Sequence, residues 1–453
     1  MSEQAVVIGG GISGLSAAWA LHRQGYACQI LESRDRVGGN LRTGHSHGYL
    51  YEHGPNSTLQ KANSPVDALG RLVSQLGLDD QLVEANPAAA KRFILKNGQL
   101  VALPTSPPAF ITSPLFSLAA KVRLLAEPFI ARGETEESIA QFVRRRLGQE
   151  FLDYAIEPFI SGVYAGNPAT LSIQAAVPKI YALEKEHGSL IRGALAMGKA
   201  MKGAGMPKGR LVSFRAGMDT LPKAIAQQLP SGAVHTKVKV TALLPLSGGE
   251  WKVVWQAQGG QEHTTTCQKL VLSLPAPAAA PLLEPLSPNA ARLVGGIAYA
   301  PIASVALGFV QNKVKHPLDG FGFLIPRREG VTTLGALFSS TLFAGRAPAG
   351  HVLITAFIGG AIHPEVMEKT DAGLVEQVVK DLTPCLGIQG EPVFVSLTRY
   401  QQAIPQYTMG HLTRLTQVKE ELAPFANLIL RANWKDGISV SDCTLHGEQV
   451  IHG

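Results

Sequence analysis

The chain opens on Ala5-Val6-Val7-Ile8-Gly9-Gly10-Gly11-Ile12-Ser13-Gly14, a short apolar run followed by glycines spaced GxGxxG. The apolar run predicts a buried parallel strand, and Leu15 to Gln24 predicts a helix that ends at Gly25. A second apolar run, Ala27 to Leu31, leads to Glu32, 18 residues beyond Gly14. This strand–helix–strand unit with an acid at its end is typical of a dinucleotide-binding fold.

Each part of the unit has a physical role. Gly9 permits the tight turn, Gly11 lets the backbone approach a pyrophosphate, and Gly14 lets the helix pack closely on the strand. The first N–H groups of the helix then face the phosphates. Glu32 can accept hydrogen bonds from ribose hydroxyls and would repel a 2′-phosphate. NAD and FAD share this unit, so the unit alone does not choose between them.

A second glycine pair follows Glu32, in Arg36-Val37-Gly38-Gly39-Asn40-Leu41-Arg42-Thr43. Paired glycines let the chain cross close to a ligand, and Arg42 is a candidate contact to a diphosphate. The segment resembles the RxGGxxxS/T segment of flavin enzymes in the amine-oxidase superfamily. The resemblance implies FAD, bound non-covalently, as the cofactor.

Five further segments resemble oxygen-dependent protoporphyrinogen oxidases, and together with Asp442-Cys443 they extend the resemblance over nearly the whole chain. They are Gly54-Pro55-Asn56-Ser57, Lys91-Arg92-Phe93, residues 161–167, residues 320–326 and residues 404–411. The resemblance implies FAD-dependent oxidation of protoporphyrinogen IX to protoporphyrin IX in haem biosynthesis, with O2 as the electron acceptor.

Roles follow from the resemblance position by position. Arg92 is implied to hold a substrate propionate, and Asn56 to hydrogen-bond a ring N–H or the flavin. Packing against the macrocycle is implied for Gly162, Leu324 and Phe357, although the last two also fit an ordinary core. The residues implied to contact FAD are Gly9, Gly10, Gly11, Ile12, Ser13, Gly14, Glu32, Gly39, Asn40, Arg42, Gly54, Pro55, Asn56, Ser57, Val240, Asn433, Ile438, Ser439 and Val440.

Three other functions stay open on the sequence. One is oxidation of coproporphyrinogen III, which carries four carboxylates instead of two. A second is amine oxidation, although residues 298–304 lack the lysine that amine oxidases often carry near the flavin. The third is non-catalytic carriage of flavin or porphyrin, because Lys435 stands where the family has an aromatic residue and Trp434 precedes it.

The predicted fold class is α/β. It comprises a Rossmann-like FAD-binding domain, an inserted mixed α+β substrate domain and a helical membrane-associating region. The FAD signals occupy residues 1–85, 205–290 and 395–453. Residues 86–204 are predicted as the helical region and residues 291–394 as the substrate-binding domain.

Composition limits the class of protein. Of 453 residues, 45% are hydrophobic and 17% charged, which excludes a disordered chain. The four cysteines are widely spaced and form no metal-binding cluster, so we predict no metal. No run of 18 uncharged apolar residues occurs, and no positively charged segment precedes the first apolar run. We therefore expect neither a transmembrane helix nor a signal peptide.

Membrane association is predicted from residues 103–131, which are rich in proline and phenylalanine and carry few charges. Such a segment suits docking at a bilayer interface, and Arg144-Arg145-Arg146 are candidate contacts to lipid headgroups. The net charge of +7 suits anionic lipid, nucleic acid or a polycarboxylate without choosing among them. We expect a cytoplasmic protein, peripheral on the inner face of the cell membrane, with no nucleic-acid partner; whether it forms a homodimer stays open.

Overall fold

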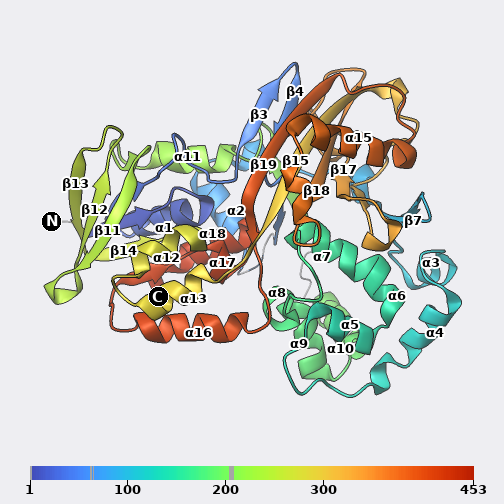
Figure 1. Cartoon of the computed structure of the whole chain (residues 1–453), viewed down its shortest axis with the longest axis horizontal. Coiled ribbons are helices and arrows are strands. Elements are labelled where there is room, and N and C mark those ends of the chain that lie inside the picture. The colour runs from blue at the N-terminus through green and yellow to red at the C-terminus, as the bar shows by residue number, and fades with distance from the viewer. Residues whose placement is uncertain (1–2, 62–63, 65, 204–208, 453) are drawn as a thin grey trace.

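The computed structural model describes residues 3–61, 64, 66–203 and 209–452. A parallel sheet with its helices forms the left part of Figure 1, and a larger sheet and a helical region form the right part. The boundary predicted between residues 204 and 205 lies outside the described residues. The mixed α/β class predicted from the sequence is confirmed.

The left part is built on a five-stranded, all-parallel sheet in the order β10-β2-β1-β14-β20. Helices and strands cover both faces of this sheet, so its strands are buried and consist mainly of apolar residues. Ala5, Val6 and Val7 of β1, for example, have no exposed surface. The bounds are β1 Gln4–Ile8, β2 Ala27–Leu31, β10 Val234–His235, β14 Lys269–Leu272 and β20 Leu428–Leu430.

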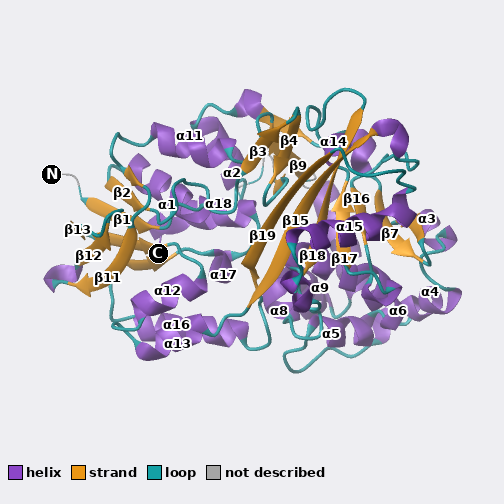
Figure 2. Cartoon of the chain, turned by 45° about the horizontal axis from the view of Figure 1, so that its top comes forward, coloured by secondary structure: helices purple, strands orange, loops and turns teal. Residues whose placement is uncertain are grey.

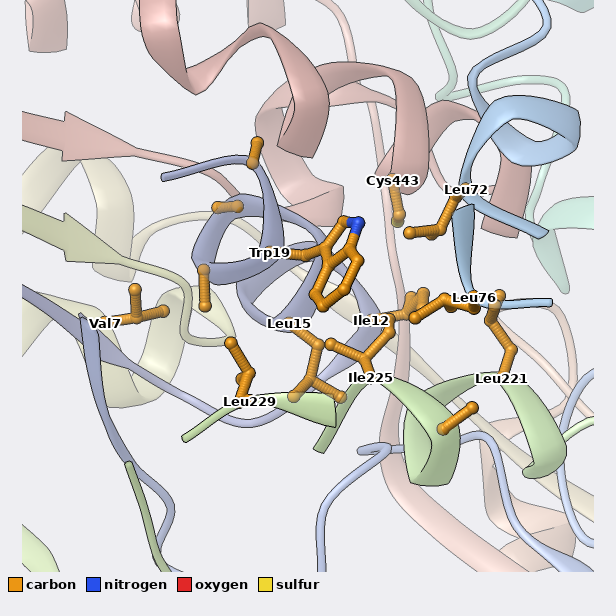
Figure 3. Close-up of a cluster of buried hydrophobic side chains, with 14 of the residues drawn as sticks. Val7, Ile12, Leu15, Trp19, Leu72, Leu76, Leu221, Ile225, Leu229 and Cys443 are labelled. Carbon is orange, nitrogen blue, oxygen red and sulfur yellow. The ribbon is translucent and has the colours of Figure 1, made fainter. Parts of the chain in front are cut away.

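One face of this sheet is covered by four helices: α1 Ile12–Arg23, α2 Ala68–Gln75, α11 Thr220–Gln228 and α18 Val440–Glu448. Figure 3 shows Leu15 and Trp19 of α1 packed among side chains of the other three. The sequence predicted that α1 begins at Leu15, but it begins at Ile12, because Leu15 N already donates to Gly11 O at 2.9 Å. The first turn therefore starts directly at the glycine loop.

The opposite face carries a three-stranded antiparallel sheet and three helices. Val253 and Trp251 of the small sheet pack with Leu283 and Val418 of the helices. The elements are β11 Lys239–Pro245, β12 Trp251–Gln256, β13 Glu262–Cys267, α12 Ala276–Leu283, α13 Pro288–Gly295 and α16 His411–Leu422.

The right part contains a seven-stranded sheet in the order β19-β15-β18-β17-β16-β7-β8. Two long strands, β15 Tyr299–Val310 and β19 Phe394–Pro405, run from it toward the parallel sheet (Figure 2). Helix α15 Asp371–Leu386 covers one face. The other strands are β7 Arg92–Lys96, β8 Gln99–Ala102, β16 Gly322–Leu324, β17 Thr333–Leu337 and β18 His351–Gly359.

This sheet departs from the predicted division of the chain. Strand β7 pairs with β16, and β8 pairs with β7, although the sequence placed residues 92–102 in the helical block. Residues 395–405 belong to β19 instead of the cofactor part. Side chains of β7 point alternately to the two faces of the sheet, which explains why this strand was assigned to the helical block. Phe93 and Leu95 pack under α15 while Ile94 packs on the helical region, so the strand is buried on both faces.

The helical region below the sheet in Figure 1 includes α5 Ile139–Arg146, α7 Glu157–Tyr164, α9 Pro178–His187 and α10 Leu190–Gly203. At its centre Arg146 is fully buried against Glu127 and Glu184. Arg145 pairs with Glu137 and Glu184. The prediction that Arg145 and Arg146 meet lipid is therefore wrong, because Arg146 is fully buried and both guanidinium groups are paired with carboxylates of the protein. In the described part of the chain, no helix is long and apolar enough to cross a bilayer.

Candidate cofactor and substrate site

The glycine loop between β1 and α1 is shaped to receive a ligand. Gly10 N donates to Glu32 Oε2 at 2.7 Å, which fixes the loop against the end of β2. Gly11 precedes the first residue of α1, and no side chain caps this helix end. A Cβ added to Gly11 would have none of the surrounding protein atoms within 4 Å. The uncapped N–H groups and the open space beside them fit a phosphate group.

The second glycine pair lies directly on the first loop. Gly38 N donates to Gly10 O at 2.7 Å, and a Cβ on Gly39 would stand 3.2 Å from Gly11 Cα. Gly54 packs as closely on Asn40, whose carbonyl oxygen would be 2.2 Å from a Cβ at position 54. The structure thus brings together three segments that are separate in the sequence.

The arginines around this loop have different partners. Arg36 donates to the backbone oxygens of Val37, Gly39 and Leu41, so its guanidinium holds the loop in shape. Burial, together with Arg34 and Arg42, lowers the pKa of Arg36. Arg42 is exposed, and its side chain contacts no acceptor among the described residues. Its charge is therefore available to a negatively charged ligand.

Glu32 and Val240 are the next two residues that were predicted to contact the dinucleotide. Glu32 is buried, and its Oε1 accepts from Arg34 N at 2.8 Å. Val238 N donates to Glu32 O at 3.0 Å, which brings the start of β11 beside the acid. Val240 follows on β11 and is half-buried against the core of that face.

The C-terminal segment meets the turn at residues 54–57, of which Pro55 is exposed and Ser57 half-buried. Ser441 Oγ lies 2.8 Å from Thr58 Oγ1, one residue past Ser57. Ser439 caps α18 by accepting from Asp442 N at 3.0 Å, and Val440 is buried on the core next to α1. Ile438 packs instead on the helical region.

Asn433 begins the short helix α17, Asn433–Asp436. Trp434 is fully buried, and its indole Nε1 donates to Leu274 O at 2.9 Å. Lys435 Nζ pairs with Asp436 Oδ1 at 2.8 Å. Trp434 therefore fills the interior of this loop, while the Lys435 ammonium is held by its neighbour Asp436.

The predicted substrate residues share one face of the seven-stranded sheet. Register places Leu324 opposite Gly335, Gly335 opposite Phe357, Phe357 opposite Ser304 and Ser304 opposite Thr398. Strands lie about 4.8 Å apart, so Thr398 and Phe357 are separated by about 10 Å. Thr398 Oγ1 in turn lies 2.6 Å from His53 Nδ1, one residue before Gly54. This row of residues connects the cofactor turn with the substrate face.

Helix α7 adds an apolar surface beside the row. A Cβ on Gly162 would stand 2.5 Å from Leu324 Cδ2, so these two residues touch instead of facing each other across a gap. Phe159 and Val163, which the sequence did not single out, are 46% and 41% exposed on the same helix. In the sequence these two apolar residues are four positions apart, which places them on one face of a helix. The same spacing also fits a buried helix face, so it does not identify an exposed surface.

Arg92 lies on β7 beside this surface. It is exposed, shares a face of the strand with Ile94, and its guanidinium stands 5.1 Å from the centre of the Phe321 ring. A cavity of about 770 Å³ also exists at the outer end of the sheet, lined by Lys315, His316 and His351. None of the predicted site residues lines that cavity.

Known proteins resemble this chain over nearly its whole length. Residues 12–449 match the family model described as flavin containing amine oxidoreductase. The chain is 35% identical to protoporphyrinogen oxidase 1, chloroplastic, of Arabidopsis thaliana, covering 98% of this chain and 86% of the relative. It is 29% identical to coproporphyrinogen III oxidase of Bacillus subtilis, covering 99% and 97%.

Solved structures share the fold. A crystal structure of a protein from Exiguobacterium sp. 255-15 matches with a TM-score of 0.83 at 26% identity, covering 100% of this chain and 98% of that one. Cyclohexylamine oxidase from Brevibacterium oxydans matches with a TM-score of 0.70 at 14% identity, covering 100% and 98%. The second likeness concerns the fold alone.

Proposed function

Because the chain belongs to the flavin containing amine oxidoreductase family, we propose that it oxidises protoporphyrinogen IX to protoporphyrin IX in haem biosynthesis, with FAD as cofactor and O2 as electron acceptor. The observation that carries this proposal is the row Leu324–Gly335–Phe357 on one sheet face, with Gly162 beside it and Arg92 on the same side. An apolar surface with one cation at its margin suits a flat macrocycle that carries carboxylates. Relatives named protoporphyrinogen oxidase cover nearly the whole chain.

FAD would be held by the three glycine segments, with Glu32 at the ribose, Arg42 at the diphosphate and residues 438–440 near the ring. Bound FAD supplies the acceptor for a hydride from a bridging carbon of the macrocycle. The chain itself orients the ring and keeps water away from it. Each hydride would be matched by one proton lost from a ring N–H, and a shift of one proton from the fourth bridging carbon to nitrogen would complete the conjugated ring. These proton losses need no strong side-chain base, because each step extends conjugation.

Arg92 offers the sharpest test of the substrate. A guanidinium can hold a propionate through two parallel hydrogen bonds worth about 1.5–3 kcal/mol. Arg92→Ala should therefore lower kcat/KM for protoporphyrinogen about 10- to 100-fold, and Arg92→Lys should recover part of the loss. FAD content should not change. Lys91→Ala is the matched control, since that neighbouring ammonium pairs with Asp319.

Coproporphyrinogen III is the second candidate, because a relative of that name matches nearly the full chain. Anaerobic addition of each porphyrinogen, followed by the loss of yellow flavin absorbance, distinguishes the two. Faster bleaching by the four-carboxylate substrate would overturn the preference for protoporphyrinogen. Bleaching by an amine alone would indicate an amine oxidase, and porphyrin binding without bleaching would indicate a carrier.

We also propose that the helical region docks on a bilayer, as a peripheral protein on the inner face of the cell membrane. Four large apolar side chains there are strongly exposed: Ile111 by 70%, Leu118 by 78%, Leu125 by 72% and Phe129 by 84%. Exposed apolar groups of this size gain about 1.5–3 kcal/mol each when buried. Leu118→Asp with Leu125→Asp should abolish cosedimentation with anionic vesicles, whereas Leu244→Asp on β11 should not. Equal binding by both variants would contradict the proposal.

A further inference from the structure

A buried ion pair beside the cofactor turn is held slightly apart. Glu52 ends β4, Tyr49–Glu52, two residues before Gly54. Arg346 follows α14, Ser339–Leu342, in the substrate part of the chain. The two side chains are only 2% and 5% exposed, yet Arg346 Nη1 and Glu52 Oε1 are 3.9 Å apart. That distance is too long for a direct hydrogen bond.

The rest of the pair is well bonded. Arg346 Nη2 donates to Ser213 Oγ at 2.9 Å and to Phe214 O at 3.1 Å. The carboxylate of Glu52 accepts from Met218 N at 2.9 Å and from Thr43 Oγ1 at 2.8 Å. Arg346 Nη1 is buried and has no partner in the described chain. A buried donor without an acceptor is costly, so a missing acceptor is expected at this atom.

A small cavity of about 10 Å³ lies between these groups. Glu52, Arg346 and Asn56 all line it, with Phe343 and Leu353 on the apolar side. One water molecule needs about this much room and two to four polar partners. Asn56 Nδ2 already donates to Gly54 O at 3.2 Å, so the amide oxygen of Asn56 remains to accept.

We propose that one water molecule occupies this cavity, accepts a hydrogen bond from Arg346 Nη1, and donates to Glu52 Oε1 and to the amide oxygen of Asn56. The water joins the substrate part, through Arg346, to the two ends of the segment Glu52–Asn56 that carries Gly54. Glu52 and Arg346 are then positioning residues: they fix the turn that meets FAD without touching the cofactor.

The charge of Glu52 gives this arrangement a pH dependence. Burial, with a smaller contribution from the nearby Asp219, raises the pKa of Glu52 to about 7 against the opposing effects of Met218 N–H, Thr43 and Arg346. Above that pH the carboxylate is charged and its bond to the water is charge-assisted, which is the stronger form. The dissociation constant for FAD should therefore rise as the pH falls through about 7, and Glu52→Gln should flatten that dependence.

Two experiments on the FAD-loaded protein test the proposal. A crystal structure at atomic resolution should show one water within hydrogen-bond distance of Arg346 Nη1, Glu52 Oε1 and Asn56 Oδ1. An empty cavity, or a direct bond between Nη1 and Glu52, would overturn it, and this measurement needs no variant to fold.

The second experiment is titration of FAD into variants. Arg346→Met should raise the dissociation constant about 10-fold, and Arg346→Lys should restore part of it by donating to the water. Asp381→Asn is the matched control. This buried carboxylate accepts hydrogen bonds from Thr333 N and Oγ1 of β17, but it lies outside the cavity. The positioning role is rejected if the dissociation constant for FAD in Arg346→Met is no higher than that in Asp381→Asn. It is also rejected if Arg346→Lys binds FAD no more tightly than Arg346→Met. The proposal depends on FAD binding and not on the porphyrinogen substrate, so normal FAD binding with no porphyrinogen oxidation would reject the substrate alone.

Discussion

At the scale of single residues, the glycines of the first loop have distinct reasons to be glycine. Gly9 has φ +106°, and a Cβ on it would stand 2.2 Å from Ser273 O. A Cβ on Gly14 would stand 2.1 Å from Gly9 O. Gly11 has φ −71°, which any residue can adopt, and open space beside it. Gly9 and Gly14 are therefore required by the fold, whereas the protein itself leaves room for a Cβ at Gly11.

Substitution should separate these roles. Gly11→Val should give protein that folds with an ordinary melting temperature but contains no flavin, because the new side chain occupies the space of the pyrophosphate. Gly14→Val should fail to fold, since its Cβ meets backbone. Circular dichroism and the flavin absorbance of the purified proteins are the measurements. Normal FAD content in Gly11→Val would reject the assignment of this loop to the dinucleotide.

At the scale of elements, the loop containing α17 depends on one hydroxyl from the end of β19. Tyr407 Oη donates to Asn433 O and accepts from Gly437 N at 3.1 Å. Removing both hydrogen bonds from a buried site costs about 1–3 kcal/mol. We expect Tyr407→Phe to raise the FAD dissociation constant about 10-fold, measured by equilibrium dialysis. Tyr164→Phe, which loses a bond to Ala176 O, should have a smaller effect, and equal effects would contradict the role given to this loop.

The elements also show what the sequence could predict. The glycine loop, α1 and Glu32 follow from local spacing, and the structure differs there in where α1 begins and, by one residue, in where it ends. The place of Leu324 and Phe357 depends on the register of β16, β17 and β18, and an apolar residue in a strand gives no sign of which face it occupies. From the sequence, Arg146 is predicted to lie on the surface, because its partners Glu127 and Glu184 are about 20 and 40 residues away along the chain. Contacts over such distances leave no local pattern.

At the scale of the whole molecule, one half-buried and one buried histidine lie where the cofactor part joins the rest. His53 bonds Thr398 of β19, and His411, which begins α16, stacks on the Tyr407 ring at 4.4 Å. Burial lowers the pKa of His53 to about 4, helped by Arg42 and Arg36, and lowers that of His411 to about 4, helped by Arg414. Both imidazoles are therefore neutral in the folded protein at neutral pH.

Acid should destabilise the protein through these groups. As the pH falls below about 6.5, the unfolded chain binds a proton at His411 while the folded chain does not until about pH 4, so folding stability is lost across that interval. The loss from His411, which is 1% exposed, is about 3 kcal/mol. His411→Phe keeps an aromatic ring against Tyr407 and should make the denaturation midpoint fall less steeply between pH 6.5 and 4. His45→Phe, at the exposed position of strand β3 Thr43–Ser46, should retain the parent slope. If the denaturation midpoint of His411→Phe fell with pH as steeply as that of the parent, this imidazole would have the same pKa in the folded and unfolded chain, and the prediction would be wrong.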